Sequence, residues 1–412
     1  MTENRLAMNG GQPAKTKPFP EWPDFDEQEV AALTRVLESR MWWRVPGTEV
    51  EAFEREFATY QQARAALAVT SGTHAIETVL SGLGIGRGDE VIVPAYTFVS
   101  TAFGVLSVNA VPILVDVDPR TYCLDPQDLQ RVLSPRTRAI MPVHLAGNIA
   151  NMDAIMEFAR RHHLAVIEDA AHAHGGEWQS QRVGALASAG IFSFQAGKLM
   201  TAGEGGCIVS QDTDLIERCY LMSSCGRSKK DRTYQHMMLG TTCRMSELHA
   251  AVLRVQLTRL DRQISRRERN AEILDKLLQT VEGITPQGRD SWTTRHPHYM
   301  YMFRYDSSYF GGMPRTEFVD SLIAEGVPAF VGYPAIHQTP AFREGNFAPR
   351  WKAQDPLLPD YQAVHCPISE ELGEQVVWLH HRTLLGDEED LAELVGAIRK
   401  IQVNAPRRTV LN

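Results

Sequence analysis

The sequence lacks the features that mark a membrane protein or a nucleic-acid-binding protein. No apolar run in its 412 residues approaches the ~20 residues that a membrane-spanning helix needs. Basic residues are in deficit, because 42 Lys and Arg stand against 50 Asp and Glu and give a formal net charge of −8. A surface that binds nucleic acid would be basic. We therefore expect small-molecule partners, with no nucleic acid and no membrane.

Cysteine is sparse and follows no ligand pattern. No two cysteines form a C-x-x-C pair, and no Cys/His group has the spacing of a zinc site. The six are Cys123, Cys207, Cys219, Cys225, Cys243 and Cys366. In a chain of this length they indicate reduced thiols, which favours a cytoplasmic protein without a bound metal. Residues 1–18 are polar and lack the apolar core of a secretory signal, so we expect a loose N-terminal arm there.

Short apolar runs rich in Val and Ile predict an α/β fold. Several show no polar alternation, which is typical of strands buried on both faces of a largely parallel sheet. The seven runs are Ala65–Thr70, Glu90–Val93 continuing into Tyr96, Val111–Asp116, Ala139–Val143, Ala165–Glu168, Ile191–Phe194 and Cys207–Ser210. Helical spacing at Thr73–Leu83, Asp125–Leu133 and Met152–His162 predicts crossover helices between them. We expect a large domain with a mainly parallel seven-stranded sheet.

A long helix is expected from Met245 to about Leu278. Arginines occupy many of its non-apolar positions, which favours a solvated helix face. They are Arg259, Arg262, Arg266, Arg267 and Arg269. We interpret this helix as the link to a second domain.

The second domain is expected to be a smaller C-terminal α/β unit that begins near Gly283. We divide the chain into an arm (1–18), a large domain (19–260), and the linking helix with the small domain (261–412). The stretch Gly332–Asp360 is rich in Pro and Gly and predicts a long loop, which is unusual unless it serves a site.

The segment Thr70–Ala75 follows a predicted strand and opens a predicted helix. Its hydroxylated and glycine residues would leave backbone N–H groups free at a helix N-terminus, where a phosphate group binds readily. The same pattern caps many helices that hold no ligand, so it indicates a phosphate site only in combination with other residues.

Asp169 stands at the end of a predicted buried strand, within Val166–His172. Ligands of α/β sheets bind at the carboxyl ends of the strands. A buried carboxylate needs a partner, and the protonated ring nitrogen of a pyridinium cofactor is one. The alternative is an ordinary helix cap after a strand.

Lys198 lies between the strand-like Phe192–Phe194 and a turn rich in glycine, Gly203–Gly206. Lysine is rarely buried without a reason, and beside an electron-poor cofactor its amine loses its proton easily and can add to an aldehyde. Ser193, just before it, can hold a phosphate oxygen. The flanking residues disfavour the alternative of a surface lysine. An aromatic in Pro94–Phe98 could stack on a flat ring, although a core position is the commoner role.

In this order the four segments resemble the DegT/DnrJ/StrS family of fold-type I pyridoxal-phosphate aminotransferases, from about Pro20 to about Asn404. The resemblance implies pyridoxal 5′-phosphate as cofactor, held by Lys198 as a Schiff base. Asp169 resembles the partner of the pyridine nitrogen, and His172 a residue near the ring's 3-hydroxyl. The resemblance further implies Phe98 as the aromatic that stacks on the cofactor ring, and Gly72, Thr73 and Ser193 as phosphate binders.

The resemblance also implies a homodimer with active sites at the subunit interface. Where the family usually has an Asn that reaches the cofactor phosphate of the neighbouring subunit, this chain has Thr242, whose hydroxyl has a shorter reach. The candidates for the substrate rim are Trp42, Arg227, Tyr333 and His337. Each of these four has a plain alternative as packing or surface.

The expected activity is transfer of an amino group from L-glutamine or L-glutamate to a cyclic ketone in the biosynthesis of antibiotics or related metabolites. The acceptor would be a keto-cyclitol, a keto-sugar or a shikimate-like ring. Met41–Arg44 and Lys198–Gly206 resemble a 3-amino-5-hydroxybenzoate synthase branch, whereas Phe303–Asp306 and Gly332–His337 resemble a glutamine:scyllo-inosose branch. The alternative reaction is therefore a dehydratase/aromatase of the former type. A cofactor-binding regulator would need a basic DNA-binding segment, for which the arm is too short.

Overall fold

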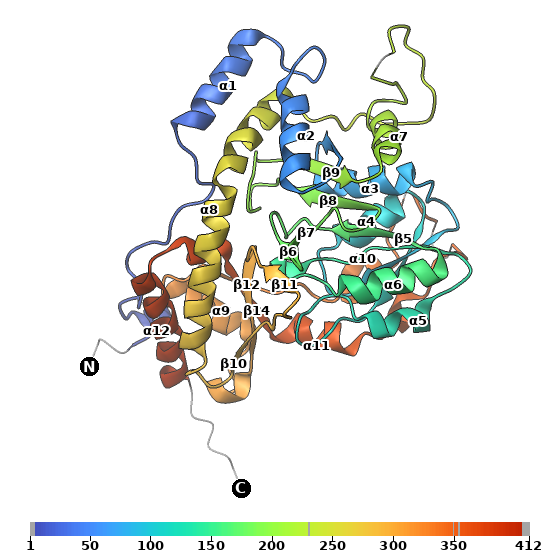
Figure 1. Ribbon diagram of the computed structural model, residues 1–412. Coiled ribbons are helices and arrows are strands. Elements are labelled where there is room, and N and C mark those ends of the chain that lie inside the picture. Colours follow the sequence, from blue (N-terminus) through green and yellow to red (C-terminus); the bar gives the residue numbers. More distant parts are fainter. Residues whose placement is uncertain (1–4, 230, 349, 353–354, 406–412) are drawn as a thin grey trace.

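The computed structural model describes residues 5–405 except 230, 349 and 353–354 (Figure 1). A seven-stranded and a four-stranded sheet form two lobes, and the long helix α8 (Glu247–Leu278) runs past both of them (Figure 1). Within the described part of the chain, no helix is both long enough and apolar enough to cross a membrane.

The large sheet confirms the predicted mainly parallel architecture. Its order is β1-β9-β8-β5-β4-β2-β3, and only β9 runs antiparallel to its neighbours. The strands are β1 (Ala65–Val69), β2 (Glu90–Pro94), β3 (Val111–Val115), β4 (Thr137–Ile140), β5 (Ala165–Asp169), β8 (Ala189–Ser193) and β9 (Gly206–Ser210). Their carboxyl ends, β9 excepted, meet at one edge, which is where ligands of such sheets bind.

Helices cover both faces of this sheet, as the apolar strands require. In β1, Ala66 and Ala68 join one core while Leu67 and Val69 join another, because successive side chains of a strand point to opposite faces. The first core is closed by α2 (Glu49–Tyr60), α6 (Met152–His162) and α8, and the second by α3 (Gly72–Gly82), α4 (Ser100–Ser107) and α7 (Thr213–Ser223). A short helix α5 (Leu129–Val132) precedes β4.

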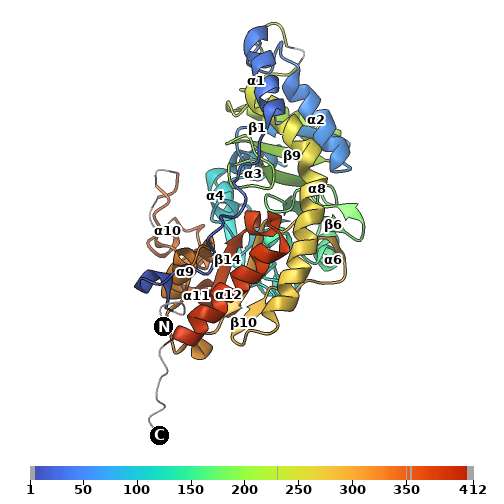
Figure 2. The same cartoon turned by 90° about the vertical axis from the view of Figure 1, so that its left-hand side faces the viewer.

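The small lobe is an antiparallel sheet of order β10-β12-β14-β13 backed by helices. Its strands are β10 (Ile284–Pro286), β12 (Met300–Tyr305), β13 (Ala329–Val331) and β14 (Val376–His380), and the helices of this region are α9 (Arg315–Ala324), α11 (Pro367–Gln375) and α12 (Glu388–Asn404). Figure 2 shows α12 lying alongside the lower half of α8. The predicted division at 260/261 falls inside α8, and the domain boundaries stay a prediction.

The prediction of a solvated arginine face on α8 is wrong for two of its five residues. Arg267 is fully buried and Arg259 is 7% exposed. Helix α1 (Glu27–Ser39) packs on α8, and Arg259 Nη2 pairs with Glu29 Oε2 at 2.7 Å. Because neighbours pack on more than one side of α8, the helical period of its own sequence did not reveal these contacts.

The arm that was expected to be loose and the stretch that was expected to be a long loop are both packed against the rest of the molecule. Of the arm, residues 5–18 are described, and Lys15 is buried in ion pairs with Asp390 (2.5 Å) and Glu393 (2.9 Å) of α12. The stretch Gly332–Asp360 includes α10 (Pro340–Arg343), whose Phe342 stacks on Phe103 of α4 at 5.8 Å between ring centroids. Apolar side chains hold this long stretch against the large lobe.

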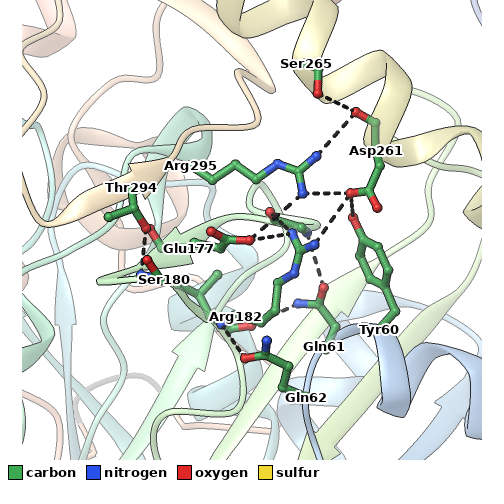
Figure 3. Close-up of polar contacts among 12 residues, drawn as sticks. Tyr60, Gln61, Gln62, Glu177, Ser180, Arg182, Asp261, Ser265, Thr294 and Arg295 are labelled. Carbon is green, nitrogen blue, oxygen red and sulfur yellow. Dashed lines mark hydrogen bonds and ion pairs between the residues drawn. The ribbon is translucent and has the colours of Figure 1, made fainter.

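A third, small sheet of order β11-β6-β7 ties the two lobes together. Its strands are β6 (Glu177–Trp178), β7 (Gln181–Arg182) and β11 (Thr293–Arg295). Figure 3 shows Arg182 and Arg295 converging on Asp261 of α8, with N···O distances of 3.5 Å and 2.7 Å. Tyr60, at the end of α2, donates its hydroxyl to the same carboxylate at 2.8 Å.

Replacing Asp261 by alanine is expected to lower the free energy of unfolding by about 1–2 kcal/mol. The side chains of Arg182 and Arg295 are only 11% and 16% exposed and would lose one acceptor each, although Glu177 stays within 3.4 Å of Arg182 and 4.0 Å of Arg295. Asp261 itself is 56% exposed, so water replaces part of the loss. Thermal and urea denaturation measure the effect. Arg262→Ala, on the adjacent exposed residue that is outside this cluster, should stay within about 0.5 kcal/mol of wild type; equal losses in both variants would contradict the assignment.

Candidate active site

One cavity lies at the edge where the parallel strands end. Its volume is about 390 Å³, which suits a small ligand. It brings together eight of the residues predicted from the sequence: Gly72, Thr73, Phe98, Asp169, His172, Ser193, Lys198 and Tyr333. These come from the N-terminus of α3, the segments after β2, β5 and β8, and the segment after β13 in the small lobe.

The N-terminus of α3 forms one end of the cavity. Ser71 caps the helix by accepting the His74 N–H at 3.1 Å, so the first N–H groups of the helix remain for a ligand. A Cβ on Gly72 would lie 2.8 Å from the Ser193 Cβ, which explains why glycine is needed where the helix start approaches β8. The helix dipole and the hydroxyls of Thr73 and Ser193 therefore suit an anionic group such as a phosphate.

Two adjacent carboxylates end β5 and have different environments. Glu168 is fully buried and accepts three backbone N–H groups, from Gly184 (2.7 Å), Leu186 (2.9 Å) and Ala187 (3.0 Å). Asp169 accepts the Thr101 hydroxyl at 2.9 Å and its side chain lines the cavity. Burial raises the pKa of Asp169 above its usual value, although the Thr101 hydrogen bond opposes the rise. Of the two acids, Asp169 is the one placed to take a cationic ligand.

Lys198 lies in the turn after β8, and its amine faces an aromatic pair. The Nζ atom is 4.4 Å from the centroid of the Tyr299 ring, on which His172 stacks at 4.1 Å. Burial lowers the pKa of Lys198 to about 8, and the charge of Asp169 opposes this. Roughly a tenth of the amine is therefore uncharged at pH 7, far more than for a lysine of ordinary pKa, and the uncharged form is the nucleophile.

His172 is held as a neutral ring. Burial, followed by the charge of Lys198, lowers its pKa well below the usual value. The Ala146 N–H donates to Nδ1 at 3.3 Å, so the ring hydrogen is on Nε2. This leaves one N–H donor available from the ring.

Two residues that line the cavity, Thr101 and Tyr299, lie outside the four segments predicted to form the site. Four more lie within those segments but were not predicted individually: Ser71, Thr97, Gln195 and Glu204. Thr101 follows Phe98 by one helical turn, so its position beside the predicted aromatic was a usable signal. Tyr299 lies immediately before β12 of the other lobe, and no local pattern connects it with Lys198.

Four predicted residues lie away from this cavity. Trp42 is half-exposed and donates to the Leu37 carbonyl, and Arg227 pairs with Asp231 at 2.9 Å. The remaining two are placed by their hydrogen bonds, Thr242 to Cys225 Sγ at 2.9 Å and His337 to Glu370 at 3.1 Å. Their roles stay predictions.

Comparison with known proteins gives consistent matches over almost the whole chain. Residues 23–399 match the sequence model of the DegT/DnrJ/EryC1/StrS aminotransferase family. The 3-amino-5-hydroxybenzoate synthase of Amycolatopsis mediterranei is 46% identical over 379 residues, which cover 92% of this chain and 95% of that protein. An L-glutamine:2-deoxy-scyllo-inosose aminotransferase of Streptoalloteichus tenebrarius is 36% identical, covering 96% of this chain and 97% of the relative.

Solved structures agree in fold. The crystal structure of a 3-amino-5-hydroxybenzoic acid synthase superposes with a TM-score of 0.88 at 44% identity, covering 95% of this chain and 100% of that chain. The S. venezuelae protein DesV, solved in complex with a ketimine intermediate, superposes with a TM-score of 0.81 at 33% identity, covering 92% of this chain and 95% of its own.

The Lys198 amine of the ligand-free protein is expected to react with trinitrobenzenesulfonate with a pH midpoint near 8, as its pKa of about 8 requires. Asp169→Asn should move this midpoint downward, because the carboxylate charge raises the pKa of the amine. Peptide mass mapping across a pH series measures the modification, with the peptide of the exposed Lys276 as internal reference for reagent loss. A midpoint that rises in the Asn variant would contradict the electrostatic coupling.

Proposed function

The chain belongs to the DegT/DnrJ/EryC1/StrS aminotransferase family, and from this membership we propose that it uses pyridoxal 5′-phosphate to aminate a six-membered cyclic ketone with L-glutamine or L-glutamate as donor. The observation that carries the proposal is the meeting of the Lys198 amine, the Asp169 carboxylate and the α3 N-terminus around one cavity.

The residues of the cavity fit this cofactor. Its phosphate suits the α3 N-terminus, where a Cβ on Gly72 would fill the space against Ser193. Its ring nitrogen suits Asp169, a buried carboxylate with a raised pKa that a cationic partner would stabilise. Phe98, 49% exposed at the cavity wall, offers a flat face for stacking. When bound, the cofactor supplies an electron sink for charge that develops on a neighbouring carbon.

Lys198 and Asp169 would carry the proton chemistry. Lys198 would hold the cofactor through its amine and, once released by the donor, would accept the proton from the donor's α-carbon at Nζ. Its lowered pKa suits an amine that must gain and lose a proton near neutral pH. Asp169 would keep a hydrogen on the ring nitrogen, because its own charge is poorly solvated without a partner.

His172 and Tyr299 would orient the Lys198 amine and the cofactor ring, and would not themselves transfer a proton. The stacked pair, 4.1 Å apart, lies against the Lys198 amine and limits its directions. The Nε2–H of His172 is available to donate to an oxygen such as the 3-hydroxyl of the cofactor ring. Tyr333, which packs on Trp378 at 4.1 Å, would close the cavity from the small lobe.

A homodimer would complete the substrate rim. Large hydrophobic side chains are exposed in the segment between α1 and α2 and in the segment after α7: Met41, Trp42, Trp43, Val45, Tyr234, Met237 and Leu239. Backbone bridges place the neighbourhoods of Trp42 and Thr242 beside the start of α8, at the same end of the molecule. We propose that a second copy covers this surface, and that Trp42, Arg227 and Thr242 then reach the cavity of the partner.

Free thiols at all six cysteines support a cytoplasmic location.

Borohydride reduction of the purified protein with its cofactor should place the pyridoxyl label on Lys198. Lys198→Ala should lose the label and the visible absorbance and lower kcat by at least about 1,000-fold, because both attachment and proton transfer depend on one amine. Peptide mapping and absorbance spectra measure these changes. A label on any other lysine would overturn the assignment.

A second candidate function is the making of an aromatic amine by dehydration, as in 3-amino-5-hydroxybenzoate synthase. The 46% identity to the Amycolatopsis protein favours it. The cavity offers hydroxyl, carboxylate and imidazole groups to either kind of ring, so the two reactions share one set of residues.

A panel of cyclic substrates separates the two reactions. Incubation of keto-cyclitols and keto-sugars with glutamine should yield an amine detected by mass, with 2-oxoglutaramate as coproduct. An aminated, dehydratable shikimate-like ring should in that case give no aromatic ultraviolet absorbance. Aromatic product without any amine from the ketone panel would replace the first function by the second.

A further inference from the structure

Two backbone carbonyl groups in the turn before Lys198 accept hydrogen bonds from side chains of distant segments. Within the turn, Lys198 N–H donates to the Gln195 carbonyl and Gly197 N–H donates to Gln195 Oε1, both at 2.8 Å. The next two carbonyls accept from elsewhere: Ala196 from Trp22 Nε1 at 3.0 Å, and Gly197 from His381 Nε2 at 3.2 Å. Side-chain donors from two distant segments therefore fix the backbone just before Lys198.

These two donors pack on each other. Trp22 lies in the N-terminal segment before α1, and His381 begins the short helix η7 (His381–Leu385) after β14. Their rings meet edge to face, with centroids 4.5 Å apart and planes at 87°. His381 is fully buried, and its ring centroid is 6.2 Å from that of Tyr299. The contact joins the N-terminal segment, the small lobe and the Lys198 turn.

Arg267 of α8 determines the tautomer of His381. Its Nη2 donates to His381 Nδ1 at 3.3 Å, and its guanidinium carbon lies 5.5 Å from the centre of the Trp22 ring. Because arginine has no acceptor, Nδ1 must be the acceptor and Nε2 must carry the hydrogen that Gly197 receives. Protonation of His381 is opposed by burial and by Arg267, so its pKa lies well below the usual value.

The packing of η7 on α8 does not by itself explain why Arg267 is buried. It is fully buried, and within the described residues its Nε and Nη1 atoms have no hydrogen-bond partner. Asn270, one turn along α8, already docks η7 by donating to the carbonyls of Leu384 (2.8 Å) and Gly386 (2.9 Å). A buried guanidinium with only one hydrogen bond is costly, which points to a role beyond holding η7 in place.

We propose that Trp22, His381 and Arg267 form a brace that positions the Lys198 amine against Tyr299 and within the field of Asp169. The three are positioning residues, since they act through the backbone of the turn. The inference rests on the proposed function, in which the Lys198 amine is the reacting group. Without the brace the turn can rotate, and the amine moves toward solvent.

His381→Phe and His381→Gln form a matched pair for the test. Phe keeps a ring of similar size but donates nothing, whereas the Gln amide nitrogen can reach the Gly197 carbonyl as Nε2 does. In the cofactor-free protein, trinitrobenzenesulfonate modification of Lys198 should shift its pH midpoint upward by about one unit in the Phe variant, toward the value of a solvated amine. The Gln variant should stay within about 0.3 unit of wild type.

The titratable and charged groups that face Lys198 and His381 are the same in wild type and in both His381 variants. Lys198 is faced by Asp169, His172, His174, Tyr299 and Tyr333, and His381 by Arg267, His380 and Arg382. None of them is altered by either substitution, so a shift in the midpoint reports the position of the amine.

Activity gives the second readout. With any ketone that the panel identifies, His381→Phe should lower kcat about 10- to 100-fold with the acceptor KM within about 3-fold, and Gln should restore most of it. Asn270→Ala is the control, because it weakens the docking of η7 and should lower Tm while leaving the Lys198 midpoint unchanged. Where His381→Phe does not fold, Trp22→Phe replaces it, since it removes the Nε1 donor and makes a partly exposed ring smaller.

A folded His381→Phe or Trp22→Phe variant with the wild-type midpoint overturns the brace, as does a Gln variant that behaves like Phe. An equal shift in Asn270→Ala also overturns it, because any loosening of η7 would then suffice. The labelling needs neither cofactor nor ketone. A shifted midpoint in a protein that aminates no ketone would therefore refute the proposed function and leave the brace standing.

Discussion

The active-site pocket must hold one amine, that of Lys198, where water solvates it poorly. Burial lowers the pKa of Lys198, and the nearby Asp169 limits how far it falls. Such an amine is useful only while its distance from the carboxylate and from the Tyr299 ring is maintained. The two groups come from neighbouring strands, β5 and β8, whose parallel pairing sets their separation. The ring comes from the other lobe, so the pocket requires the two lobes to keep a fixed position relative to each other.

Several independent contacts fix the relative position of the two lobes. Helix α8 runs past both sheets, and the cluster around Asp261 ties the small β11-β6-β7 sheet to it. The brace at Trp22, His381 and Arg267 connects the same helix to the turn of Lys198. Arg267, a fully buried charged side chain of α8, therefore lies where the small lobe and the turn of Lys198 meet.

The end of β5 shows how position along a strand separates structure from chemistry. Glu168 and Asp169 are neighbours, yet their side chains point to opposite faces of the sheet. Glu168 has three backbone donors as well as His144 and stabilises the loop before β8. Asp169 has one hydroxyl and one backbone donor and keeps capacity for a ligand. This difference in hydrogen bonding is why we propose a structural role for Glu168 and a cofactor-binding role for Asp169.

Local sequence patterns were sufficient for the strands, for the crossover helices and for placing Asp169 and Lys198 at strand ends, because periodicity and turn chemistry depend on near neighbours. The roles of Gly72, Phe98 and His172 came from the resemblance to a family. All seven predicted strands occur, and eight of the predicted site residues share one cavity. Tertiary structure alone decided the rest. The burial of Arg267 and the packing of Lys15 depend on segments far away in the chain, which no helical period encodes. Tyr299 reaches Lys198 only because β12 of the small lobe folds against the large one, and a contact between distant segments leaves no trace in either segment's own pattern.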